Sequence, residues 1–337
     1  MFRLASFSGK YWLLPLLASA ALLIGCSSDD DDDNGAGAGG GSSSGGSFGS
    51  GGFGVELPDS GTSGTGGGSG LPIDPTGFTP AEVGGYKLGD PISSGGLDGV
   101  PGGSDCGSYI LGVVRDFKGA DEPGGHPDFE VFSGDEATLN LVEDTLGDHQ
   151  KPVYASECET RRESPACPYG QQTTTRAAFD QWYRFDENVN KPYLVYFQFE
   201  PRNDVYTFQS DFFFPLDGEG WGNSGRGNDE KPHNFHFTTE VHTRFTYNGG
   251  ETFRFIGDDD VWVFINGKLA LDLGGLHPTV TGVVDLDEQA AELGLTRGQV
   301  YPLDLFHAER HRTASRFRID TNLAFVDCGS VPPDGPE

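Results

Sequence analysis

The sequence predicts an all-β fold, a β-sandwich or barrel with one short helix, preceded by a disordered Gly/Ser-rich tether. Three observations support this prediction. Aromatic residues make up 12% of the 337 residues and Met occurs once, which is typical of β-rich proteins rather than helical bundles. Apolar and polar residues alternate over long stretches of the C-terminal part, and short turns rich in Asn and Gly separate these stretches. Antiparallel β domains have this organisation.

The first 25 residues are predicted to be a signal peptide. Arg3 and Lys10 form a short basic region, and residues 11–24 form an apolar run that is shorter than the roughly 20 residues needed to span a bilayer. The sequence Leu23-Ile24-Gly25-Cys26 resembles the lipobox of bacterial lipoproteins. This resemblance implies a lipid anchor on Cys26 and export to the outer membrane or cell surface of a bacterium. An ordinary signal peptide with a chance cysteine is the alternative.

Residues 26–105 are predicted to be a disordered acidic linker. Between Asn34 and Gly70, 17 of the 37 residues are Gly and 8 are Ser. No apolar pattern there offsets the entropy that ordering would cost. We expect the linker to hold a folded domain away from the lipid surface.

The net charge of −29, from 51 acidic and 22 basic residues, restricts the partners. Such a chain repels phosphate backbones and anionic lipid headgroups. We therefore expect no nucleic-acid partner and no membrane contact except through the lipid anchor. Cations are the expected partners.

The longest predicted strand covers residues 235–247. Its odd positions, beginning with Phe235 and Phe237, are mostly apolar, and its even positions are polar or charged. This period of two predicts a strand with one buried face. Residues 317–325 repeat the pattern, which predicts a second long antiparallel strand.

Turn sequences predict further strands between residues 252 and 273. Asn248-Gly249-Gly250 separates the long strand from residues 252–256, and Asn266-Gly267 separates residues 261–265 from residues 268–273. Asn-Gly favours a two-residue hairpin turn, in which both turn residues adopt positive φ.

Residues 286–293 form the one predicted helix of appreciable length. Asp285 or Asp287 is its predicted N-cap because an aspartate oxygen accepts hydrogen bonds from the unpaired amides of the first turn. The remaining pattern is β almost throughout.

Four cysteines remain after Cys26, and in an exported chain they suggest two disulfides. Cys106 and Cys328 bracket all of the chain that is expected to fold, and Cys158 and Cys167 flank a Ser-Pro-containing loop. We expect these two pairs, although the sequence permits three connectivities. Free thiols or a metal site are the alternatives, and no CxxC spacing supports a metal site. The predicted β domain is residues 106–328, followed by a tail at 329–337.

Several sequence blocks inside this domain resemble the fibro-slime domain. The longest block runs from Phe255 to His277 and includes Gly257-Asp258-Asp259-Asp260-Val261-Trp262. The others are His126-Pro127-Asp128-Phe129-Glu130, Phe179-Asp180-Gln181-Trp182-Tyr183, Phe213-Phe214-Pro215-Leu216-Asp217, His233-Asn234-Phe235-His236-Phe237-Thr238 and Phe306-His307-Ala308-Glu309-Arg310-His311. The similarity covers about residues 109–325. That family occurs on bacterial surfaces and in slime moulds, and it is similar in turn to the protective-antigen-type β-barrel domain of adhesins, toxins and glycosidases.

This resemblance implies binding rather than a reaction. In the adhesin branch, two adjacent aspartates joined by a cis peptide bond hold a calcium ion, and sugar hydroxyls take its remaining positions. Asp258 and Asp259 correspond to that pair. Asp260 stands where the wider family often has Gly, so its role in ligand binding is open.

The residues also suggest a cation site without the family. Three consecutive carboxylates repel one another as they leave water, and a hard divalent cation with oxygen ligands, such as Ca²⁺, neutralises them. A nearby aromatic side chain, Trp221 or Trp262, offers a stacking face for a sugar. The alternative is a solvated loop in which Asp258 caps the turn.

Three further residues are candidate ligand contacts. Asn228 lies in a Gly-rich loop and could complete a calcium shell or a sugar pocket. His277 and Glu309 are expected on the same rim. With His307 and His311 they allow a zinc site, although the spacing is not that of a metallohydrolase.

The expected function is calcium-dependent binding of a glycan or polysaccharide matrix at the cell surface. No catalytic residue is predicted because no nucleophile elbow, HExxH motif or phosphate loop occurs. A structural surface or matrix protein without lectin activity is the first alternative. A secreted glycoside hydrolase is the second, but a chain with 51 acidic residues can always offer two carboxylates at a suitable distance.

Overall fold

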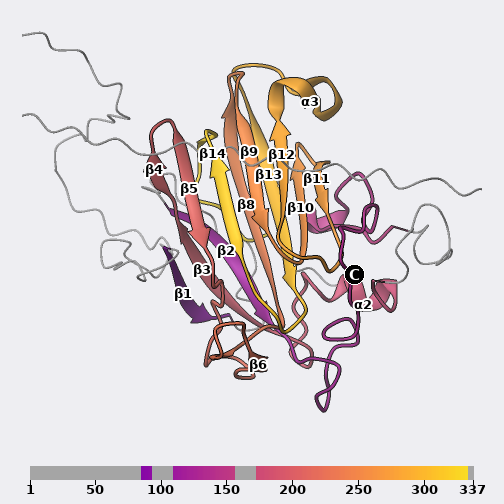
Figure 1. Cartoon of the computed structure of the whole chain (residues 1–337). Coiled ribbons are helices and arrows are strands. Elements are labelled where there is room, and N and C mark those ends of the chain that lie inside the picture. The colour runs from indigo at the N-terminus through magenta and orange to yellow at the C-terminus, as the bar shows by residue number, and fades with distance from the viewer. Residues whose placement is uncertain (1–84, 93–108, 156–171, 333–337) are drawn as a thin grey trace, which may run out of the picture. The chain divides into compact units, whose positions relative to one another are not determined.

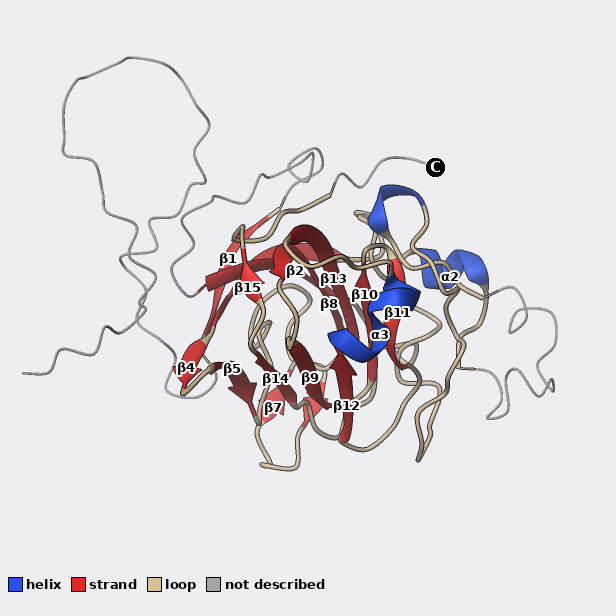
Figure 2. Ribbon diagram, turned by 90° about the horizontal axis from the view of Figure 1, so that it is seen from above, coloured by secondary structure: helices blue, strands red, loops and turns tan. Residues whose placement is uncertain are grey.

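The computed structural model describes residues 85–92, 109–155 and 172–332. All of them lie in one compact unit, Gly67–Glu337. These residues form two antiparallel sheets that pack face to face (Figures 1 and 2). The described strands do not close into a barrel, so the fold is the sandwich form of the predicted all-β class.

The larger sheet contains eight strands. Its order is β1 (Tyr86–Pro91), β3 (Lys191–Gln198), β2 (Tyr109–Asp116), β8 (Phe237–Tyr247), β13 (Gln299–Glu309), β10 (Asp260–Ile265) and β11 (Lys268–Leu273), with β15 (Ala324–Phe325) paired to β8. The smaller sheet has the order β12 (Val280–Asp285), β9 (Thr252–Gly257), β14 (Phe317–Thr321), β5 (Val205–Ser210) and β4 (Glu200–Arg202). A separate ribbon joins β6 (Gly225–Arg226) to β7 (Pro232–His233), and the described helices are α2 (Arg176–Asp180), α3 (Leu286–Leu293) and the 3₁₀ turn Asp148–Gln150.

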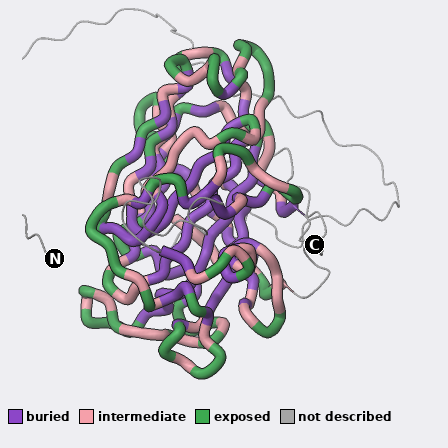
Figure 3. The backbone as a smooth tube through the Cα atoms, turned by 90° about the vertical axis from the view of Figure 1, so that its right-hand side faces the viewer, coloured by how far each residue is buried: buried purple, intermediate pink, exposed green. Residues whose placement is uncertain are grey.

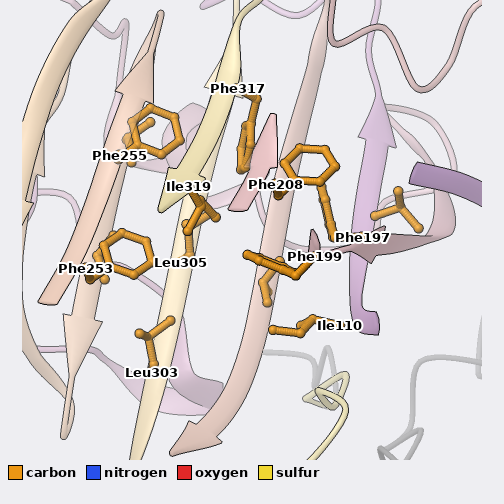
Figure 4. Packing of buried hydrophobic residues seen from close by; sticks show 14 of the residues in the cluster. Ile110, Phe197, Phe199, Phe208, Phe253, Phe255, Leu303, Leu305, Phe317 and Ile319 are labelled. Atoms are coloured by element: carbon orange, nitrogen blue, oxygen red, sulfur yellow. The ribbon is translucent and has the colours of Figure 1, made fainter. Parts of the chain in front are cut away.

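Phenylalanine side chains fill the space between the two sheets (Figure 4). Phe317 on β14 lies 5.8 Å, ring centre to ring centre, from both Phe197 of the larger sheet and Phe208 of the smaller one. Alternate residues of each strand point into this layer, so the period-two pattern in the sequence produces the core.

The outer face of the larger sheet is also covered. Residues 117–155 and 172–190, which include α2, pack a second apolar cluster against β10 and β13. Its fully buried members include Phe129, Phe179, Trp182, Trp262, Phe264 and Phe306. Figure 2 shows α2 on this outer side, and Figure 3 shows buried residues through the middle of the molecule and exposed residues around its outside.

This cover explains why β8 is buried on both faces, whereas the sequence predicted one buried face. Its polar residues Thr238, Glu240 and His242 are at most 3% exposed. The Glu240 carboxylate accepts hydrogen bonds from Lys151 at 2.8 and 2.9 Å and from Arg115 at 3.1 Å. Buried charges require such partners, and these come from segments remote in the sequence.

The predicted helix and hairpin turn agree with the structure, whereas the long strand predicted over residues 317–325 is divided into β14 in the smaller sheet and β15 in the larger one. The predicted helix is α3, and Asp285 accepts hydrogen bonds from the amides of Asp287 and Glu288. Asn266 and Gly267 both have positive φ, at 54° and 72°, as the two-residue hairpin between β10 and β11 requires.

Two boundaries need correction. Residues 86–91, predicted as part of the disordered linker, form β1 and pair with β3, with Tyr86 against the core. The alternation of Tyr86 and Leu88 is short and is interrupted by Gly89 and Pro91, so the surrounding Gly-rich sequence obscured it. Val331, in the predicted tail, is 1% exposed and packs against the sheet.

The remaining predictions about chain organisation lie mostly outside the described residues. The signal peptide, Cys26, Cys106, Cys158 and Cys167 all fall there. Cys328 is disulfide-bonded, but the predicted pairing stays a prediction. No helix in the described ranges has the length and apolar content needed to cross a membrane.

Candidate ligand-binding site

Five loops surround a cavity of about 360 Å³ at one end of the sandwich, opposite α3. At this end β2, β9 and β13 finish and β3, β8 and β10 begin; we call it the cavity end. The lining residues are Ser133, Gly134, Asn228, Asp258, Asp259, Leu276, His277, Pro278, Thr279, His311, Thr313 and Ala314. The volume is at the small end of the roughly 300–1,000 Å³ found for small-molecule sites.

The turn between β9 and β10 brings Asp258 and Asp259 to the cavity, although each is only 6% exposed. The Asp258 carboxylate accepts hydrogen bonds from the Arg316 amide at 2.7 Å and from the Thr279 hydroxyl at 2.9 Å. Its carbonyl oxygen accepts a hydrogen bond from Nε2 of His307 at 3.1 Å. These contacts fix the turn, and burial raises the pKa of Asp258.

Asp259 is held more loosely than Asp258. One of its oxygens accepts the Arg310 amide at 3.0 Å. Burial, together with the neighbouring charges of Asp260 and Asp258, raises the pKa of Asp259 to about 8. Loss of hydration favours the neutral acid, and no cationic side chain forms an ion pair with the charged form of Asp259 among the described residues.

Glu309, at the end of β13, is a third carboxyl group beside the pair. It is 1% exposed, and neither of its oxygens has a well-formed hydrogen bond, although the Ser315 hydroxyl and the Asp259 carboxyl face it. Burial and then the charges of Asp259 and Asp258 raise its pKa well above the ordinary value. Burying such a group without a partner is costly.

Asp260 differs from its two neighbours because it points to the outer side of the larger sheet. Its carboxylate binds Nε of Arg310 at 2.6 Å and the Gly275 amide at 2.6 Å, and both charged side chains are fully buried. The Arg310 guanidinium also donates to the carbonyls of Asp128 and Gln172. Asp260 therefore ties the covering segment to the sheet and does not line the cavity.

Within the described part of the chain, one of the other two predicted ligand contacts at the cavity has a free side chain and the other does not. The exposed Asn228 lines the cavity, and no hydrogen bond occupies its side-chain amide among the described residues. His277 also lines it, but its two ring nitrogens lie 2.9 and 3.0 Å from the carbonyl oxygens of Pro278 and Leu273. His277 therefore shapes the wall.

Neither predicted stacking residue lines the cavity. Trp262 is fully buried, and its ring nitrogen donates to Asp272 at 3.0 Å, so the prediction of a free ring face at Trp262 is wrong. Trp182 and Tyr183 are buried in the outer cluster. Trp221 is 38% exposed but belongs to a different loop at the cavity end.

Sequence reasoning missed several wall residues. Ser133 comes from the segment that covers the outer face, and Thr279 and Thr313 come from loops that follow β11 and β13. None lies in a pattern that marks a ligand contact, because loop convergence is decided by strand order.

Two features differ from the implied adhesin site. All peptide bonds within the described residues are trans, including the Asp258–Asp259 link. No group of three or more His, Cys, Asp or Glu side chains in the described ranges is arranged to hold a metal ion. That includes the histidines suggested as zinc ligands.

Comparisons with known proteins show similarity to the PA14 domain and to Dictyostelium proteins, and the fibro-slime resemblance stays a prediction. Residues 188–332 match the model of the PA14 domain. Protein psiR of Dictyostelium discoideum is 38% identical over 229 residues, which cover 63% of this chain and 22% of psiR. Protein psiC of the same organism is 39% identical over 209 residues, covering 60% of this chain and 39% of psiC. The matches span between about a fifth and two fifths of these relatives.

The similarities to solved structures are low. A PA14 sugar-binding domain from an RTX adhesin has a TM-score of 0.22 and 10% identity, and covers 38% of this chain and 77% of that chain. The A domain of epithelial adhesin 9 from Candida glabrata, solved with Galβ1-4GlcNAc, has a TM-score of 0.25 and 12% identity. The match covers 74% of this chain and 99% of the adhesin domain. Neither similarity is close enough to transfer a site. Residues 188–332 are therefore similar to the PA14 domain.

Proposed function

We propose that this protein is a non-catalytic, cell-surface carbohydrate-binding protein that holds a glycan in the cavity, with a calcium ion on Asp258 and Asp259. The proposed location is the surface of a bacterium, with Cys26 as the lipid anchor. The fibro-slime resemblance supports the same role.

One observation carries the proposal. Asp258 and Asp259 line the cavity, and Glu309 faces Asp259 behind it; all three are almost completely buried, and within the described residues none forms an ion pair. Other buried acids nearby, Glu240 and Asp260, have cationic partners within 3.1 Å. Buried carboxyl groups without a cationic partner, two of which line the cavity, favour a divalent cation.

Calcium suits this donor set better than zinc because every side chain offered is an oxygen donor. Asp258 and Asp259 would hold the ion, and the free amide of Asn228 faces the same space. An ion held there would supply open coordination positions for neighbouring hydroxyl groups of a sugar. The protein's own part is to fix the turn and exclude water, through the Arg316, Thr279 and Arg310 contacts.

Thermal unfolding of the full chain tests the calcium claim. Calcium at 100 times its dissociation constant should stabilise the wild type by about 2.7 kcal/mol. Asp259→Asn should remove this gain because it removes the ligand charge. Asp320→Asn, which alters an acid on β14 that does not line the cavity, should keep it. An unchanged unfolding curve for the wild type at millimolar calcium would contradict the metal site.

Glycan binding separates this proposal from its alternatives. We expect chelator to abolish binding on a glycan array and Asp259→Asn to reproduce that loss. Calcium-dependent light scattering without any sugar would favour a structural matrix protein, and release of sugar from a glycoside would favour a hydrolase.

A further inference from the structure

The ammonium groups of two lysines lie over the ring of Trp221 at the cavity end. The ammonium of Lys191 lies 3.7 Å from the centre of the indole ring and that of Lys118 lies 4.2 Å from it. The two distances place the nitrogens at most about 8 Å apart. The ring is 38% exposed, and both lysines are partly exposed, so solvent reaches this cluster.

Hydrogen bonds to β2 and β3 fix the loop that carries Trp221. The Trp221 amide donates to the buried carboxylate of Asp116, and the Gly220 amide donates to the Tyr193 hydroxyl at 3.0 Å. Lys191 donates one of its three ammonium protons to the Gly220 carbonyl at 2.7 Å. The cluster is therefore preorganised, which lowers the entropy that a ligand must overcome on binding.

The charge of this cluster is unusual for the molecule. The chain has a net charge of −29, and most described arginines and lysines contact carboxylates. Lys231, for example, lies 3.5 Å from Asp229. Within the described residues neither Lys118 nor Lys191 forms an ion pair. The charge of Lys191 also acts on the buried carboxylate of Asp116, but Lys118 and the exposed side of the cluster leave positive charge that favours an anion.

The cluster and the cavity lie on the same end of the larger sheet. Lys191 on β3 is in register with Asp116 on β2, Asp116 with Phe237 on β8, and Phe237 with Glu309 on β13. β10, which carries the aspartate turn, is the next strand. Strands lie about 4.8 Å apart, so four spacings put the lysines roughly 15–20 Å from the aspartates. One sugar residue cannot fill both places, but different residues of one glycan chain can.

We propose that Lys118, Lys191 and Trp221 form a second subsite, which binds the carboxylate or sulfate group of an acidic sugar in the same glycan. The two ammonium groups form charge-assisted hydrogen bonds to the anion. The indole ring holds them in place by cation–π contact. This inference rests on the proposed glycan-binding role, but it does not require the calcium ion.

Tryptophan fluorescence of the full chain, recorded in EDTA, tests the subsite directly. Trp182 and Trp262 are fully buried. The part of the fluorescence that acrylamide quenches in the wild type but not in Trp221→Phe therefore comes from Trp221. Millimolar glucuronate should reduce this quenching, whereas glucose, which lacks the carboxylate, should not. Raising the salt concentration should weaken the glucuronate effect. Equal effects of glucuronate and glucose, or none from either, would overturn the proposal.

Oligosaccharide binding provides the second test. The probes are a hyaluronan hexasaccharide and the same hexasaccharide with its carboxyl groups reduced to alcohols, measured by calorimetry. We expect wild type to prefer the acidic form by about five- to tenfold, as two partly exposed charge contacts allow. Lys118→Gln, which breaks no hydrogen bond in the described structure, should reduce this preference severalfold. Lys87→Gln, a lysine on β1, is the matched control and should retain it.

The outcomes separate the two claims. Loss of the preference in Lys118→Gln with neutral-sugar binding intact supports the subsite, and circular dichroism with an unchanged unfolding midpoint excludes misfolding. A preference that Lys118→Gln and Lys118→Glu both leave unchanged refutes the subsite while the cavity function stands. Glucuronate protection of Trp221 in a protein that binds no neutral sugar and no calcium would instead overturn the cavity function.

Discussion

The buried histidines show how neighbouring residues set the state of a single side chain. His307, on the core face of β13, faces phenylalanine rings and one carbonyl, and burial lowers its pKa to about 4. His242, on the outer face of β8, donates from Nδ1 to Asp304 at 2.7 Å. Burial alone would lower the pKa of His242, but the hydrogen bonds and charges of Asp304 and Glu240 outweigh it and raise the pKa.

Asp304→Asn should therefore destabilise the protein more at pH 6 than at pH 9. The folded pKa of His242 lies above its ordinary value of 6.5, so this stabilisation is complete below about pH 6.5 and is lost as the pH rises through the folded pKa. Removing a hydrogen bond to a charged group costs about 1.5–3 kcal/mol, and we expect that loss at pH 6. Urea unfolding at both pH values measures it. Asp211→Asn, which removes an exposed ion pair with Arg316, is the control, and equal losses at both pH values in Asp304→Asn would contradict the prediction.

The aspartate turn shows what sequence reasoning can identify at the residue scale. Asp258 and Asp259 were predicted as a cation-binding pair, and the structure brings both to a cavity. The different position of Asp260 could not be predicted because it depends on Arg310, 50 residues away along the chain. Strand alternation indicates that consecutive side chains point to opposite faces, but it does not indicate what covers each face.

At the scale of elements, capping and turn residues agree with the sequence. The N-cap of α3 is Asp285, which accepts hydrogen bonds from two first-turn amides, and its C-cap is Gly294 in the left-handed conformation. Gly tolerates that conformation because it has no Cβ. These signals act within a few residues, so they remain valid in any tertiary context.

Asp285→Ala should destabilise the protein by about 1 kcal/mol, because two first-turn amides lose their acceptor. Asp285→Ser, which keeps a capping oxygen, should cost less. The difference between the two midpoints of urea unfolding tests this prediction. An alanine variant as stable as the serine variant would mean that packing alone fixes the helix start.

At the scale of the whole molecule, the sandwich depends on aromatic packing between sheets. Phe317 contacts rings from both sheets and from the loop before β6, including Phe213 at 4.8 Å and Phe255 at 5.1 Å between ring centres. The same core positions the site, because β14 leads directly from the loop that carries Thr313 and Arg316.

Phe317→Ala should destabilise the protein by about 3–5 kcal/mol, the usual cost of removing a buried phenylalanine. Phe212→Ala, at a ring that is 51% exposed, should change stability by about 0.5 kcal/mol or less. Urea unfolding should show a lower midpoint for Phe317→Ala with an unchanged slope. Equal losses for the two variants would contradict the assigned core.

The sequence by itself determined the all-β class, the main strands, the Asn266-Gly267 turn, the α3 helix and the aspartate pair, because each depends on residues close together in the chain. The tertiary structure decided the pairing of Asp260 with Arg310, the second buried face of β8, and the meeting of five loops at one cavity. It also placed Trp221 away from that cavity. These features depend on strand order and on the packing of residues 117–155 and 172–190, and contacts between distant segments leave no periodic signal in the sequence.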